Sequence, residues 1–121
     1  MAIISSSIIV IVAMLHLYIF WLESFAWTTR GRKVFKNFPA ELFEKTKPMA
    51  ANQGLYNGFL AAGLLWSLFI ENEEWRINVA MFFLGCVAIA GMYGASTVQK
   101  SIFYIQALPA IVGLICLYFN I

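Results

Sequence analysis

Hydrophobic residues gather in four long runs along the chain, and the connections between them carry most of the charged residues. The runs cover Ile3–Trp27, Met49–Ile70, Ile77–Ala95 and Ile102–Ile121. A helix needs about 20 mostly apolar residues to cross a hydrocarbon layer of about 30 Å, and its backbone groups must be satisfied within the segment. The pattern predicts an all-α polytopic membrane protein, with four transmembrane helices bundled into a single domain over residues 1–121.

Composition supports a membrane protein over a soluble domain. Hydrophobic residues make up 62% of the chain and charged residues only 12%, whereas soluble domains are about half apolar and a quarter charged. Membrane lipids are therefore expected partners, and the net charge of +2 is too small to indicate nucleic acid. No Lys or Arg precedes the first run and no small-x-small site closes it, so we expect it to remain as a span.

The basic residues predict the orientation. Six of the eight Lys and Arg residues lie in connection 28–48, and Lys100 lies in connection 96–101. The connection between them carries one basic residue, Arg76, against three acidic ones: Glu71, Glu73 and Glu74. Since Lys and Arg accumulate in cytoplasmic loops, loops 28–48 and 96–101 are predicted to be cytoplasmic, with the N- and C-termini outside.

The first connection is not uniformly polar. Phe35, Phe38 and Leu42 recur at helical spacing among lysines, and Pro39 stands where a first helical turn begins. We predict a short amphipathic helix, Phe38–Lys47, lying on the inner leaflet between the first two spans. A solvated basic loop is the alternative.

Polar side chains inside the runs are the candidate site, because such groups are costly in lipid and usually face the protein interior. At about 100° per residue, His16 and Glu23 share a stripe of the first helix with Phe20 and Trp27. Most of the polar residues fall in the cytoplasmic half of the spans. The predicted ligand-binding residues of this cytoplasm-facing pocket are His16, Glu23, Asn52, Gln53, Asn57, Tyr93 and Gln106.

Small residues indicate where helices approach each other. Gly54 and Gly58 follow one another at four-residue spacing, as do Gly91 and Ala95, and such pairs allow close helix contact. We expect Gly54 and Gly58 to lie opposite the amide face of their helix. One face would then pack while the other lines the pocket.

His16 and Glu23 are the candidate catalytic residues, but no catalytic role is assigned to them. Seven helical residues separate them by about 10.5 Å, too far for a direct acid–base relay at about 2.6–3.2 Å. No metal or other cofactor is expected, since the chain has one histidine and no aspartate. Cys86 and Cys116 lie in apolar runs and are expected to be small core residues.

Three functions suit these features. The first is binding or transport of a small or lipid-like molecule, with Glu23 as a proton- or cation-linked acid. Four short helices enclose little volume, so transport is expected to require a homodimer. The second is an enzyme that uses His16 and Glu23 on a lipid-soluble substrate, and the third is a structural or assembly protein without a ligand.

Four strings of the sequence carry a family resemblance. They are His16–Glu23 with Trp27, Ala51–Gly58, Gly91–Gly94 and Gln106–Ala110. Together they resemble a family of short bacterial membrane proteins called domain of unknown function 1304, over essentially the whole chain. The resemblance implies a four-helix protein of the bacterial plasma membrane, and it implies no particular activity.

Overall fold

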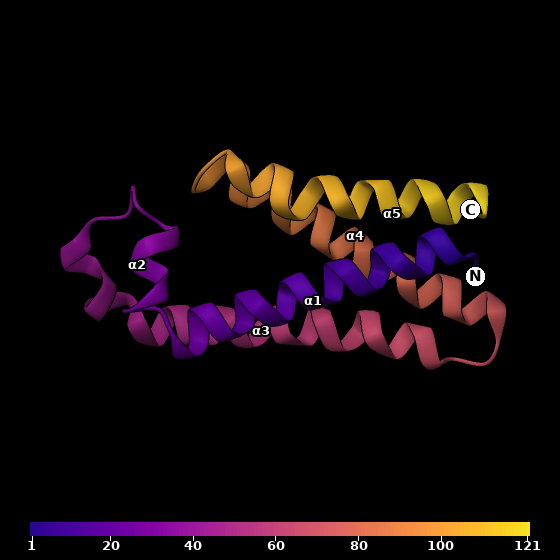
Figure 1. Ribbon diagram of the computed structural model, residues 1–121, viewed down its shortest axis with the longest axis horizontal. Helices are drawn as coiled ribbons and strands as arrows, with labels where there is room; N and C mark the ends of the chain where they lie inside the picture. The colour runs from indigo at the N-terminus through magenta and orange to yellow at the C-terminus, as the bar shows by residue number, and fades with distance from the viewer. The chain divides into compact units, whose positions relative to one another are not determined.

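The computed structural model describes residues 1–121 as helices joined by short turns (Figure 1). The α-helices are α1 (Ile3–Phe25), α2 (Arg30–Val34), α3 (Phe43–Phe69), α4 (Glu73–Thr97) and α5 (Leu108–Phe119); a 3-10 helix, η1 (Ala40–Leu42), precedes α3, and a π-helix, η2 (Phe103–Ala107), precedes α5. The expected all-α fold class is confirmed.

Two helices are long and apolar enough to cross a membrane, namely α1 with 23 residues and α4 with 25. At about 1.5 Å per residue they measure roughly 35 and 38 Å, more than the hydrocarbon layer of about 30 Å. α3 is longer, with 27 residues, but charged residues and amides in its first half make it less apolar. The helical stretch Phe103–Phe119 is apolar and shorter.

The connection after α1 differs from the predicted amphipathic helix, and that prediction is wrong. Pro39 is extended, with φ −57° and ψ 129°, and only the single turn η1 separates it from Phe43. α3 then begins at Phe43 and runs through Pro48 without a break. Pro48 is the sixth residue of α3, so its missing N–H removes only one hydrogen bond near the helix start. The lysines expected on a separate helix therefore belong to the first turns of α3.

The last apolar run is helical as expected, but its first part is a π-helix. The N–H of Leu108 donates to the carbonyl of Phe103, five residues earlier. Pro109 follows directly and has no N–H to donate, so the usual four-residue ladder is interrupted at this point. The π-helix changes the direction in which the side chains of residues 103–107 point.

The chain forms two compact units. The larger unit comprises Met1–Met14 and Leu60–Ile121, and the smaller unit comprises Leu15–Phe59. The core of the larger unit contains Ile9, Val12, Ala13, Leu64, Ala80, Leu84, Val87, Ala88, Ala110 and Leu117. That the chain is a single transmembrane domain stays a prediction.

Within the larger unit, α4 and the helical stretch after it lie side by side (Figure 1). Gly91 lies against Ala107, and farther back along α4 Leu84 lies against Gly113. These contacts move backward along α4 as they advance along η2 and α5, so the pair is antiparallel. Glycine at positions 91 and 113 lets the helices approach closely.

Asn72 caps the N-terminus of α4 and offers a test of this helix. Its side chain accepts a hydrogen bond from the N–H of Trp75 at 3.0 Å. Replacing Asn72 with Ala is expected to lower the free energy of unfolding by about 1 kcal/mol, because a helix-end N–H loses its partner. Circular dichroism during denaturation in mixed micelles measures this change. Asn78→Ala, an exposed site inside the same helix, is the matched control and should raise stability by up to roughly 0.7 kcal/mol.

Candidate functional site

A carboxyl–amide pair joins α1 and α3 inside the smaller unit. Glu23, near the end of α1, is 6% exposed. Nδ2 of Asn57 on α3 donates a hydrogen bond to its Oε1 over 2.7 Å. The same Nδ2 lies 3.2 Å from the carbonyl oxygen of Gln53, one turn earlier. The amide is thus held by its own helix while it contacts the carboxyl group of the neighbouring one.

Glycines allow α1 and α3 to come this close. A Cβ atom at Gly54 would lie 2.4 Å from Oγ of Ser24 and 3.0 Å from Cβ of Glu23. A Cβ atom at Gly58 would lie 3.1 Å from the ring of Phe20. The Ser24 hydroxyl donates to the carbonyl oxygen of Ala51 at 2.8 Å, so a side chain of α1 is also bonded to the backbone of α3.

The glycines and Asn57 therefore share one side of α3. The expectation that Gly54 and Gly58 lie opposite the amide face is wrong, because both glycines and Asn57 contact α1. The face that packs is also the face that carries the polar pair.

An aromatic cluster closes the smaller unit beyond Glu23. Its rings belong to Trp27, Phe35, Phe38 and Phe43. Nε1 of Trp27 donates to the Thr46 hydroxyl at 3.0 Å, and the Arg32 guanidinium lies 4.9 Å from the centre of the Phe43 ring. This cluster packs the end of α1 against the start of α3. It therefore helps to set the register of the two helices, which brings Glu23 level with Asn57.

His16 is fully buried in α1. α1 is continuous between His16 and Glu23, so the rise along the helix keeps their backbones about 10.5 Å apart. The two side chains do not form a direct acid–base pair. Their joint action on one ligand stays a prediction.

The remaining candidates are not gathered around Glu23 within the smaller unit. Asn52 and Gln53 are exposed on α3. Tyr93 on α4, 71% exposed, and Gln106 in η2, half-buried, belong to the larger unit. Their participation in a site with Glu23 stays a prediction.

Sequence reasoning did not identify Ser24, Thr46 or the phenylalanine rings of connection 28–48 as residues that join α1 to α3. The available signal was the stripe of Phe20, Glu23 and Trp27 on α1, which marks the side that α3 covers. Cys86 is half-buried and Cys116 buried, both as free thiols, and no three His, Cys, Asp or Glu side chains are grouped as metal ligands.

Fold and site together define a small all-helical protein with a buried interhelical carboxyl–amide pair and two helices able to span a membrane. The chain belongs to the family described as protein of unknown function, DUF1304, whose model matches residues 10–118. It is 28% identical over 121 residues to the "uncharacterized protein YpaA" of Lactococcus lactis subsp. lactis (strain IL1403), covering 98% of this chain and 100% of the relative. No solved structure matches the chain.

Proposed function

We propose that the protein is a multi-pass plasma-membrane protein that binds or transports a small or lipid-like molecule at Glu23. In this proposal all four apolar runs span the bilayer, loops 28–48 and 96–101 are cytoplasmic, and both termini are outside. Transport, as distinct from binding, would require a homodimer, because four short helices enclose little volume.

Exposed apolar side chains support the membrane placement. Trp21 on α1 is 46% exposed, and Phe82 and Ile89 on α4 are 65% and 66% exposed. Only 28% of the most apolar window of each helix is buried inside the protein. Apolar surface of this extent is unfavourable in water and favourable in lipid. The concentration of basic residues in two loops supports the orientation.

The hydrogen bond between Glu23 and Asn57 is the observation that carries the binding proposal. A carboxyl group inside a spanning helix is costly, and such groups commonly mark ion or substrate pathways. Asn57 satisfies one oxygen with a neutral amide, and a cation or a ligand N–H group can take the same place with a stronger interaction. Glu23 is almost fully buried, so a ligand reaches it only when the α1–α3 contact opens around Asn57. The contact in the structure is then the closed state of a two-state element.

A structural role is the second candidate, and the close packing of Gly54 and Gly58 against α1 favours it. In that case the pair of Glu23 and Asn57 would simply fix the register of the two helices. Polar pairs between membrane helices contribute about 0.6–2 kcal/mol in this way.

A lipid-soluble organic cation separates the two candidates. The full chain in phosphatidylcholine nanodiscs is titrated with tetraphenylphosphonium by calorimetry, at acidic and at alkaline pH. We expect binding that strengthens at alkaline pH, because protons and the cation compete for the Glu23 carboxylate. Glu23→Gln keeps an oxygen that accepts from Asn57 but removes the charge, so affinity should fall at least about tenfold and lose its pH dependence.

Glu41→Gln, at an exposed carboxyl before α3, is the matched control and should leave binding unchanged. Equal affinity of the wild type and Glu23→Gln for the cation would contradict the binding proposal and leave the structural role in its place.

A further inference from the structure

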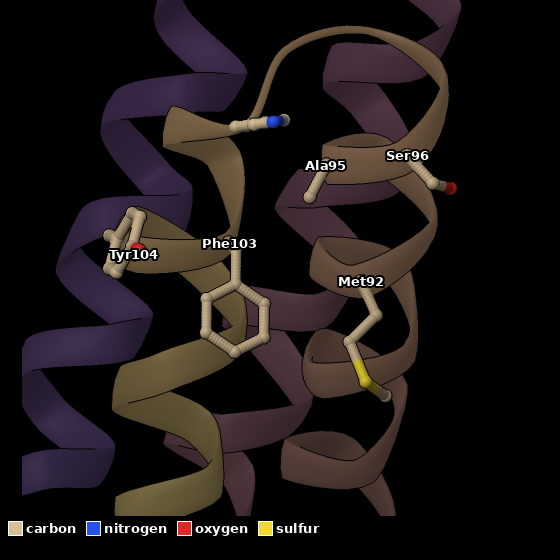
Figure 2. Close-up of a pocket in the computed structure, with 6 residues that line it drawn as sticks. Met92, Ala95, Ser96, Phe103 and Tyr104 are labelled. Carbon is tan, nitrogen blue, oxygen red and sulfur yellow. The ribbon is translucent and has the colours of Figure 1, made fainter.

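A surface groove in the larger unit lies apart from Glu23 in sequence and is not used by the proposed function. It has a volume of about 320 Å³ and is shallow and broadly open at the surface. Its lining residues are Met92, Ala95, Ser96, Lys100, Phe103 and Tyr104. Figure 2 shows Met92 and Ala95 on α4, with Phe103 of η2 on the neighbouring helical segment beside them. The walls are therefore mostly apolar, and one of the lining side chains is an ammonium group.

The positive charge of Lys100 has no acidic residue near it in the sequence to balance it. No acidic residue follows Glu74, and Lys100 is the one basic residue after Arg76. The two ion pairs of the structure join Glu73 to the amino group of Met1 and to Arg76, and Lys100 takes part in neither. The Ser96 hydroxyl already donates to the carbonyl oxygen of Tyr93 at 2.9 Å. Lys100 is thus the lining group best able to hold an anion.

The π-helix shapes the apolar wall of the groove. Phe103 is the first residue of η2 and Tyr104 the second, and their rings meet edge to face at 5.5 Å. Tyr104 is 68% exposed and Met92 45% exposed, so this wall continues outward onto apolar surface. A ligand that fits these features has an anionic group at one end and a hydrocarbon part that lies along the rings and Met92.

We infer that this groove binds an anionic phospholipid, with the phosphate at Lys100 and an acyl chain along Met92, Phe103 and Tyr104. The inference rests on the membrane placement of the proposed function and not on Glu23. Lys100 lies in loop 96–101, which the proposed function places on the cytoplasmic side of the membrane. On that side, basic groups between helices bind anionic lipid headgroups. The long lysine side chain can hold its charge at headgroup level while its methylene groups lie against the apolar wall.

Native mass spectrometry of the full chain in detergent tests the inference. The chain is titrated with phosphatidylglycerol, with phosphatidylcholine of the same acyl chains, and with glycerol phosphate. We expect a preference for phosphatidylglycerol and no comparable binding of glycerol phosphate. Lys100→Gln should weaken phosphatidylglycerol binding by about fivefold, whereas Lys100→Arg should keep it.

Two further variants separate the groove from general surface charge. Ala95→Phe fills the groove without changing charge and should weaken both lipids, provided that its helical circular dichroism matches the wild type. Lys33→Gln, at an exposed lysine of α2, is the matched control and should change nothing.

The inference is overturned if Lys100→Gln retains the full preference, or if Lys33→Gln lowers it equally. Tight binding of glycerol phosphate would overturn it in favour of a free-phosphate site. Glu23→Gln is expected to keep the lipid preference. Failure of the cation-binding proposal can therefore be distinguished from failure of the lipid-binding inference.

Discussion

Replacing Gly91 with alanine is expected to lower the free energy of unfolding by about 1–3 kcal/mol, the usual range for an overpacked interior. A Cβ atom at this position would lie 2.5 Å from the backbone nitrogen of Ala107 and 2.9 Å from its Cα and Cβ. Ala107 is fully buried in η2, and a backbone cannot rotate aside as a flexible side chain does. α4 and η2 must therefore separate, and this loss exceeds the helix-propensity gain of about 1 kcal/mol.

Gly85 on the same helix provides the matched control. A Cβ atom there would meet nothing within 4 Å. Gly85→Ala should therefore raise the free energy of unfolding by roughly 0.5–1 kcal/mol, the ordinary effect of removing glycine from a helix interior. Circular dichroism during unfolding in mixed micelles measures both variants. If Gly91→Ala proves as stable as Gly85→Ala, the close approach of α4 to η2 is not present in solution.

The existence of the long helices could be predicted from the sequence because each apolar run is too long for anything but a helix. The first apolar run predicts a helix that ends at Trp27, and α1 ends at Phe25. The start of α3 is less evident from the sequence. Pro48 suggests a boundary in sequence, but a proline in the first turns of a helix removes little hydrogen bonding. The helix consequently extends back to Phe43, whose ring is buried by an aromatic cluster that only folding brings together.

The π-helix could not be predicted from hydropathy. Pro109 signals an interrupted ladder, yet the signal does not say whether the chain kinks, ends a helix or shifts its hydrogen bonds to five-residue spacing. The close contact of Gly91 with Ala107 depends on that choice. The groove beside Phe103 depends on the same shift to a π-helix. Neither the helix contact nor the groove could therefore be predicted from the sequence.

The sequence predicts that Glu23 and Asn57 belong to the same site, but it does not predict a direct hydrogen bond between them. Asn57 follows Gly54 by three residues, which places the two within about 60° around the helix. This spacing already contradicts opposite faces for glycines and amides. What the sequence lacks is the distance between α1 and α3, which the contact of Gly54 with Ser24 sets.

Asn57→Leu is expected to lower the free energy of unfolding by about 1–3 kcal/mol, because the buried carboxyl group of Glu23 loses its amide donor. Replacing both residues by leucine should restore most of that stability, since an apolar pair leaves no buried polar group unsatisfied. The two single variants and the double variant form a thermodynamic cycle. It should give a coupling energy within the range of about 0.5–3 kcal/mol found for residues in contact.

An exposed amide on the same helix serves as the control for this cycle. Gln53→Leu alters α3 one turn before Asn57 at an exposed side chain, so its effect on stability should stay within about 0.5 kcal/mol. Unfolding by sodium dodecyl sulfate in mixed micelles, followed by circular dichroism, gives the free energies of unfolding of the wild type, the three variants of the cycle and the Gln53→Leu control. Additive effects of Glu23→Leu and Asn57→Leu would show that the two side chains do not interact in solution. Coupling combined with lost cation binding in Glu23→Gln would instead mean that one carboxyl group both holds α1 to α3 and receives the ligand.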